Sequence, residues 1–337
     1  MKIAYLILAH GNWSHLLRLV DSLDSADSFF FIHVDKKATA VAPIPQRDNV
    51  ILLKDRVIVS YAGYSMVEAT LRLLRAAYEA NYFDYFALLS GADYPIRSNP
   101  YIHSFFENKS PKNFIDVVKI PDESMPQYRR LAKYHIEGGY RQKSLLRRLG
   151  INGTEELLRL LPFKRTFPKE YSEYEMCAGS SWWALHNSFV AYLLSYRLSN
   201  PKFFNFYRHS LCPDEMIFQT IMMNSPFRDS VAHGLTYDDW NVGPPPYPSS
   251  IGAIHLPILQ QELVAPFYRR IIDHTPPGHR ANAYEVDLRR AFGSVTAELG
   301  SECLFARKFG DSSSGILEKV ETIRRSFGPY SPNHTRS

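Results

Sequence analysis

Runs of apolar residues alternate with amphipathic segments in the first third of the chain. Residues 3–9, 29–34 and 83–89 are largely apolar, which is typical of strands buried on both faces of a parallel sheet. Residues 16–23 and 67–78 repeat apolar side chains at helical spacing. Because strands and helices alternate, the pattern predicts an α/β fold with a mostly parallel, twisted central sheet flanked by helices.

The pattern predicts one domain over residues 1–328. Residues 1–99 have the features of a nucleotide-binding α/β half, and residues 171–328 form the second half of the domain. Residues 100–170 are rich in Arg and Lys with regularly spaced Leu, which predicts a basic helical insertion. Such a stretch suits a solvated pair of surface helices, an acceptor-binding subdomain or a membrane-surface patch. Residues 329–337 are expected to be a disordered tail.

Polar residues stand where the predicted strands end. His10 follows the first strand, His33, Val34 and Asp35 close the second, and Asp93 follows the third. In open α/β sheets, ligands bind in the crevice at the carboxyl ends of the strands. Histidine and aspartate there suit hydrogen bonds to a ribose or a base, and the same groups would suit a metal ion in a metal-dependent hydrolase. No Gly-rich dinucleotide fingerprint follows the first strand.

Two adjacent carboxylates, Asp214 and Glu215, follow Pro213 and precede an apolar run. Proline at the first position and acids in the first turn are typical of a helix start, so the motif predicts a helix that begins there. The acids then have two interpretations. They complement the helix dipole, or one of them faces a cleft and acts as a general base.

Composition limits the partners and the compartment. The 337 residues carry a net charge of +5 and a pI near 8.9, which suits an anionic ligand and is too small an excess to indicate nucleic acid. Three widely spaced cysteines, Cys177, Cys212 and Cys303, form no disulfide or metal pattern and indicate a reducing compartment. No run is long enough to span a membrane. We therefore expect a cytoplasmic protein, with a peripheral contact at the inner face of the membrane.

Seven short motifs follow one another in a fixed order, at residues 5–10, 31–37, 59–65, 89–96, 179–183, 213–215 and 304–309. With them, the chain resembles the core-2/I-branching β-1,6-N-acetylglucosaminyltransferases and the related peptide O-xylosyltransferases, in the compact form found in bacteria. The resemblance covers most of the chain, apart from roughly residues 100–170 and 258–300. It implies that residues 171–328 form the acceptor-binding and catalytic half.

The resemblance implies a GT-A-like fold, a UDP-sugar donor, inversion at the anomeric carbon and independence from metal ions and other cofactors. It implies that Glu215 is the catalytic base, that Lys308 binds the donor diphosphate, and that residues 33–35 lie at the nucleotide. The chain departs from the family at residues 252–257, which contain no second diphosphate-binding arginine. Arg307 or Arg269 is expected to take its place.

The expected reaction moves N-acetylglucosamine, or as second choice xylose, to a hydroxyl of a glycan or lipid-linked glycan. Among the candidate sugar contacts, Asp93 is expected to hold a donor hydroxyl, while Trp182 and Trp183 are expected on opposite faces of a strand, so at most one lines the site. The alternative function is that of a non-catalytic protein that binds a sugar nucleotide or a glycan. The other candidate contacts with sugar or acceptor are Asp214 and Trp240.

Overall fold

The structure is a computed structural model. It describes residues 1–38, 44, 47–120, 126–138, 153–154, 165–239, 248–261, 302–310 and 313–332. Trp240, Arg269 and most of the amphipathic stretch between residues 139 and 164 therefore lie outside the described residues.

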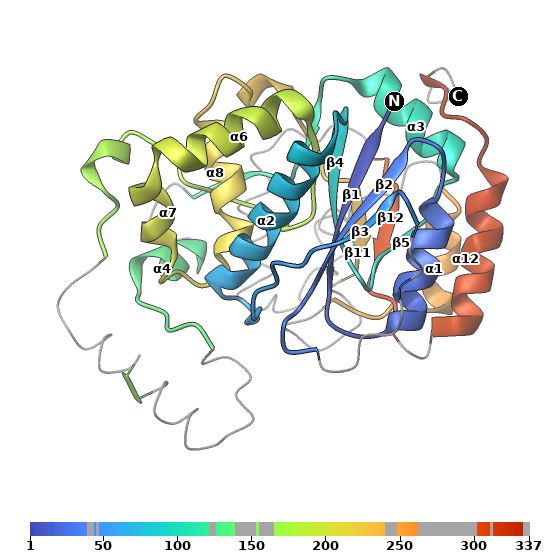
Figure 1. The fold of residues 1–337 in the computed structure, drawn as a ribbon, viewed down its shortest axis with the longest axis horizontal. Helices are drawn as coiled ribbons and strands as arrows, with labels where there is room; N and C mark the ends of the chain where they lie inside the picture. The colour runs from blue at the N-terminus through green and yellow to red at the C-terminus, as the bar shows by residue number, and fades with distance from the viewer. Residues whose placement is uncertain are drawn as a thin grey trace, which may run out of the picture.

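A seven-stranded sheet forms the centre of the fold (Figure 1). β1 pairs in parallel with β2 and β4, and β2 pairs in parallel with β3, while β9 runs antiparallel to β4 and β6. The predicted α/β class with a mostly parallel sheet is thus confirmed. In spatial order the strands are β10 (Val231–Ala232), β6 (Asn113–Phe114), β9 (Ala184–His186), β4 (Tyr85–Ser90), β1 (Ile3–Ala9), β2 (Ser28–Val34) and β3 (Val50–Leu52).

Side chains of β1 alternate between two hydrophobic cores, one on each face of the sheet. Ile3, Tyr5 and Ile7 enter one core, and Leu6 and Leu8 enter the other. Figure 1 shows α1 and α12 on one side and α2, α6, α7 and α8 on the other. This explains why the strands have continuous apolar sequences. The helices are α1 (Trp13–Leu23), α3 (Asn99–Lys109) and α12 (Ser314–Ser326) in the first core, and α2 (Tyr64–Ala80), α6 (Asn187–Ser199), α7 (Pro201–Tyr207) and α8 (Ile217–Met223) in the second.

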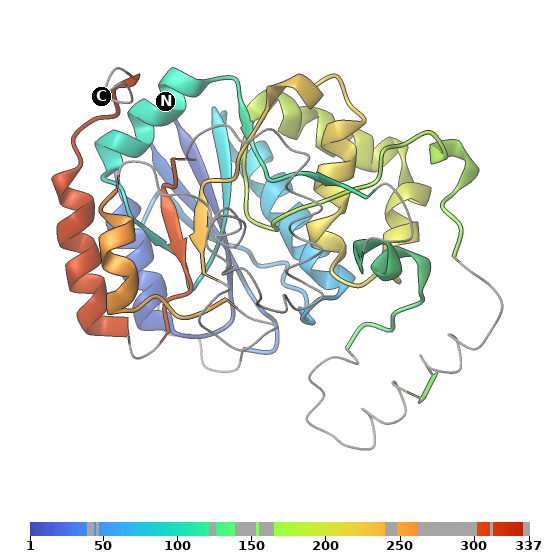
Figure 2. The ribbon, with the colours of Figure 1, turned by 180° about the vertical axis from the view of Figure 1, so that it is seen from behind.

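A second sheet of three short strands brings the C-terminal part of the chain to the central sheet (Figure 2). β12 (Phe305–Arg307) runs parallel to β11 (Thr236–Asp238) and antiparallel to β5 (Tyr94–Pro95). Because Ala306 is paired with Tyr94, Arg307 comes next to the turn that follows β4.

The remaining elements are short. β7 and β8 form a two-stranded antiparallel sheet, and α4 lies near the end of α7. Their bounds, with those of the 3-10 helices η1 to η4, are β7 (Val118–Lys119), β8 (Cys177–Ala178), α4 (Pro126–Ala132), α9 (Leu256–Leu259), η1 (Lys169–Tyr171), η2 (Pro213–Glu215), η3 (Arg228–Ser230) and η4 (Ala253–His255).

Two predicted boundaries differ from the structure. The basic helical insertion was expected to begin at residue 100, but α3 and β6 occupy its first part, and β6 belongs to the central sheet. The tail was expected from residue 329, but Tyr330 is buried with its ring against Tyr101 and Phe105. In both places short apolar segments in a polar stretch pack against distant residues, which a local pattern does not reveal.

Candidate active site

Glu215 lies on a single 3-10 turn. The N–H groups of Glu215 and Met216 donate to the carbonyls of Cys212 and Pro213, three residues back, at 3.1 and 3.2 Å. Cys212 enters the turn in the left-handed conformation with φ 50°. The predicted helix start at Pro213 is therefore wrong in detail, because Met216 leaves helical geometry and α8 begins at Ile217.

The carboxylate of Glu215 is held by an arginine from α4. Arg130 Nη1 donates to Glu215 Oε2 at 2.6 Å, and the two side chains are 24% and 36% exposed. Glu215 is thus oriented and still open to a substrate. No sequence signal separated Arg130 from the other cations of its basic stretch, since its partner is 85 residues away.

Asp214 points the other way, into the protein. It is buried, and its Oδ2 accepts a hydrogen bond from Ser181 Oγ at 2.7 Å, whereas Oδ1 has no partner among the described residues. Burial, and then the charge of Glu215, raises the pKa of Asp214 to about 6.

The loop of residues 179–183 fits closely against the turn of Glu215. Gly179 donates its N–H to Glu215 O at 2.8 Å. A Cβ at Gly179 would collide with the backbone of Asp116, so this close approach requires glycine. The loop thus fixes the backbone of the candidate base and leads directly to Trp182.

Arg307 stacks on Trp182 and faces Asp93. The guanidinium carbon lies 4.1 Å from the centre of the Trp182 ring, and Arg307 Nε lies 3.4 Å from Asp93 Oδ1. Asp93 is fully buried, and Ser90 donates to it from its N–H at 2.8 Å and from its hydroxyl at 2.6 Å. Among the described residues, no hydrogen bond occupies the Arg307 guanidinium, so its terminal nitrogens have donors available for an anion.

The residues at the end of β2 fix a neighbouring loop. His33 Nε2 accepts from Val57 N–H at 3.0 Å, and burial lowers the pKa of His33. Asp35 Oδ1 accepts from the N–H groups of Lys37 and Val59 at 2.9 and 3.3 Å. These side chains therefore fix the backbone of residues 57–59, and their role toward a nucleotide stays a prediction.

The other predicted site residues occupy different surroundings. Val34 is part of the core, whereas His10 is exposed where β1 ends. Lys308 follows Arg307 in the chain, and its carbonyl accepts from Ile251 N–H at 2.8 Å. Trp183 is buried against Phe218, with 5.5 Å between ring centres, while Trp182 is the one that contacts Arg307.

No group of three His, Cys, Asp or Glu side chains in the described part of the chain could hold a metal ion. Among the same residues, no helix is long and apolar enough to cross a membrane.

The fold and the site together define an α/β domain with a partly exposed carboxylate and a stacked, hydrogen-bond-competent arginine at the carboxyl edge of its sheet. The chain belongs to the Core-2/I-Branching enzyme family, whose model matches residues 3–259. The GT-A-like fold expected for this family agrees with the mostly parallel sheet flanked by helices. Arg307 and Lys308 lie beyond the matched residues, so the family match does not bear on them.

Curated relatives are xylosyltransferases. Xylosyltransferase 1 of Rattus norvegicus is 29% identical over 253 residues, which cover 72% of this chain and 28% of that protein. Xylosyltransferase 2 of the same species is 28% identical over 254 residues, or 27% of its length. The chain thus spans about a quarter of these relatives. The structure of mouse xyloside xylosyltransferase 1 in its apo form aligns over 93% of this chain and 99% of that one. The identity is 13% and the TM-score is 0.36.

Proposed function

We propose that the chain is an inverting, metal-independent glycosyltransferase that moves a sugar from a UDP-sugar to a hydroxyl of a glycan or lipid-linked glycan. Glu215 is the general base, and Arg307 and Lys308 bind the donor diphosphate. The observation that supports this most is that two contacts between neighbouring residues link the segment of the base to the cation. Asp214, next to Glu215, bonds Ser181, whose neighbour Trp182 stacks on Arg307.

The two acids divide the roles. Glu215 is 36% exposed and can reach an acceptor, whereas Asp214 is buried and bonded to Ser181. Glu215 takes the proton from the acceptor hydroxyl as the oxygen attacks the anomeric carbon from the side opposite the nucleotide. The bond from this carbon to the diphosphate oxygen breaks, and UDP leaves with the electron pair.

Fixed cations neutralise the charge that develops on UDP. Arg307 is held between the Trp182 ring and Asp93, so little conformational entropy is lost when it binds a phosphate oxygen. Lys308, the next residue, supplies the second charge. Because Arg307 lies beside the end of β4, it takes the place of the arginine that is missing from residues 252–257.

The names of the curated relatives favour xylose as the donor sugar, and N-acetylglucosamine is the alternative that we expected from the motifs. Thermal unfolding with UDP, UDP-xylose and UDP-N-acetylglucosamine identifies the nucleotide and the sugar. We expect stabilisation by UDP and by one of the two donors, unchanged in EDTA. Stabilisation that disappears in EDTA and returns with a divalent metal would contradict metal independence.

The test of the base is Glu215→Gln, with the exposed Glu173→Gln as a matched control. Removal of a general base is expected to lower the rate of sugar transfer by about 10²- to 10⁴-fold while UDP still stabilises the protein. Glu173→Gln is expected to transfer at the wild-type rate. If Glu215→Gln also transfers at that rate, Glu215 is not the base. If the wild type binds the donor and transfers its sugar to no glycan acceptor, the chain is a binding protein.

A further inference from the structure

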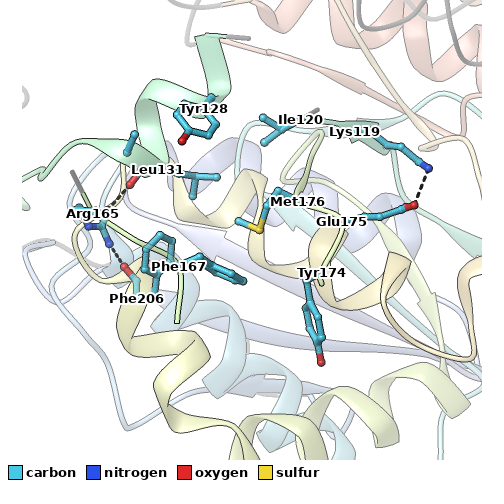
Figure 3. Close-up of a pocket in the computed structure, with 11 residues that line it drawn as sticks. Lys119, Ile120, Tyr128, Leu131, Arg165, Phe167, Tyr174, Glu175, Met176 and Phe206 are labelled. Carbon is cyan, nitrogen blue, oxygen red and sulfur yellow. Dashed lines mark hydrogen bonds and ion pairs between the residues drawn. The ribbon is translucent and has the colours of Figure 1, made fainter. Parts of the chain in front are cut away.

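A cavity of about 360 Å³ lies beside α4, and Figure 3 shows the side chains that line it. Its wall combines side chains of α4 with side chains of residues 119–120, 165–167 and 174–176 and of Phe206. The wall is largely apolar and rich in aromatic rings. It contains Ile120, Tyr128, Leu131, Phe167, Tyr174, Met176 and Phe206, with Lys119, Ala132, Arg165 and Glu175.

One helix separates this cavity from the candidate base. Tyr128, Leu131 and Ala132 of α4 line the cavity, as expected for residues three and four positions apart on one helical face. Arg130 lies between them in sequence and extends from another face of the helix to Glu215. The same short helix therefore contacts the cavity on one side and the base on another.

The cavity is also close to the base along the chain. Met176 lines the cavity, and Gly179, three residues later, donates its N–H to Glu215 O. β8 connects the two, and three residues of extended chain span about 10 Å. The wall of the cavity and the backbone of Glu215 are therefore about 10 Å apart along β8.

The charged side chains around the cavity are already paired. Arg165 donates hydrogen bonds to the carbonyls of Leu131 at 3.0 Å, His209 at 2.9 Å and Phe206. Burial lowers the pKa of Arg165 to about 10, so the side chain is still a cation at neutral pH. Lys119 Nζ bonds Glu175 Oε1 at 2.9 Å. The wall thus offers no unused charge to an ionic ligand, and its rings and alkyl groups suit a neutral, apolar one.

We propose that this cavity binds the apolar aglycone of the acceptor, an alkyl chain or an aromatic ring joined to the sugar that receives the donor. This rests on the proposed function and adds the substrate class to it. The volume is sufficient, because a cavity of about 150 Å³ accommodates benzene, so about 360 Å³ takes a group twice that size. The acceptor is then an amphipathic glycoside whose sugar lies at Glu215 and whose apolar group lies behind α4.

Binding is tested first with simple probes, methyl and hexyl β-D-glucoside, by calorimetry below the micelle concentration. Each methylene that enters an apolar site tightens binding by about fourfold, so the hexyl glucoside is expected to bind at least tenfold tighter than the methyl glucoside. Ala132→Phe fills the cavity and is expected to abolish this difference, whereas Ala132→Ser keeps it. Met176→Gln makes the cavity polar and serves where Ala132→Phe does not fold. A hexyl preference that survives in both variants would overturn the proposal.

Transfer is tested next with pairs of methyl and hexyl glycosides of glucose, galactose and N-acetylgalactosamine, with product detected by mass spectrometry. We expect the hexyl member of the accepted pair to have a KM at least tenfold lower with a similar kcat, and Ala132→Phe to remove this advantage. Equal KM values for both members would refute the assignment to the acceptor, even if hexyl glucoside binds. Stabilisation by UDP, measured on the same samples, separates this result from a failure of the proposed function, in which UDP has no effect.

Discussion

Asp214→Asn tests whether a buried carboxylate is retained beside the base at a cost in stability. The pKa of Asp214 is raised from 3.8 to about 6 by burial and by Glu215. Because the folded protein holds this proton more tightly than the unfolded chain does, folding is disfavoured as the pH rises through the interval between the two values. A difference of about 2 in pKa corresponds to about 3 kcal/mol of unfolding free energy, lost between about pH 3 and pH 7.

The assay is denaturant unfolding of the wild type and of Asp214→Asn at pH 4 and at pH 7.5. The amide adds a buried N–H₂ group without a partner, but this cost is the same at both pH values and cancels in the comparison. We expect the stability of the variant relative to the wild type to rise by about 2 kcal/mol from pH 4 to pH 7.5, because the unfolded carboxyl is already partly ionised at pH 4. Asp229→Asn, at an exposed site, controls for loss of a carboxylate and should show no such trend. If Asp214→Asn shows no trend either, Asp214 is not desolvated and the reasoning is wrong.

Two further variants test how the site is held. Trp182→Leu removes the ring that stacks on Arg307, a contact that contributes about 1–2 kcal/mol when it is desolvated. We therefore expect the Kd for UDP, measured by calorimetry, to rise about 5- to 30-fold. Trp183→Phe, in the core, should leave that Kd unchanged, and an equal effect of both variants would argue against the stacking role. Arg165→Met removes the donor that bonds the carbonyls near the ends of α4 and α7, so we expect the free energy of unfolding to fall by about 2–4 kcal/mol. We also expect kcat to fall while the Kd for UDP is unchanged. The control, Arg75→Met at an exposed pair, should do neither, and a rise in the Kd for UDP would contradict a role confined to α4.

The central sheet could be predicted because its strands are buried on both faces. Residues 3–9 form β1 with the expected bounds, since their continuous apolar sequence is required by the two cores they enter. The alternation of side chains along β1 follows from the period of two of an extended chain, which is written into the local sequence. The two tryptophans were expected on opposite faces of a strand, but both precede β9 and both belong to the second core. Within that core Trp182 contacts Arg307 and Trp183 packs on Phe218.

Contacts between distant segments could not be predicted in the same way. Arg130 and Glu215 are 85 residues apart, and Arg165 joins the ends of α4 and α7 by bonding backbone carbonyls, which leave no trace in the sequence. The turn of Glu215 was mistaken for a helix start because proline followed by acids is common to both. Its 3-10 geometry depends on the left-handed Cys212, whose N–H is bonded by Ala62 O at 2.9 Å from a separate loop.

Arg165 is largely buried because it lies between the ends of α4 and α7 and bonds the backbone of both helices. The guanidinium bonds Leu131 O near the end of α4 and Phe206 O on α7, so it fixes the one helix that presents Arg130 to the base. An exposed Glu215 with no fixed partner would sample many rotamers. In most of them its carboxylate would face away from the acceptor, which lowers the fraction of encounters in which the proposed base can take the acceptor proton. The same helix forms a wall of the cavity proposed for the aglycone. An acceptor that packs there therefore contacts the element that orients the base, so that recognition of the apolar group and alignment of the carboxylate depend on a single helix.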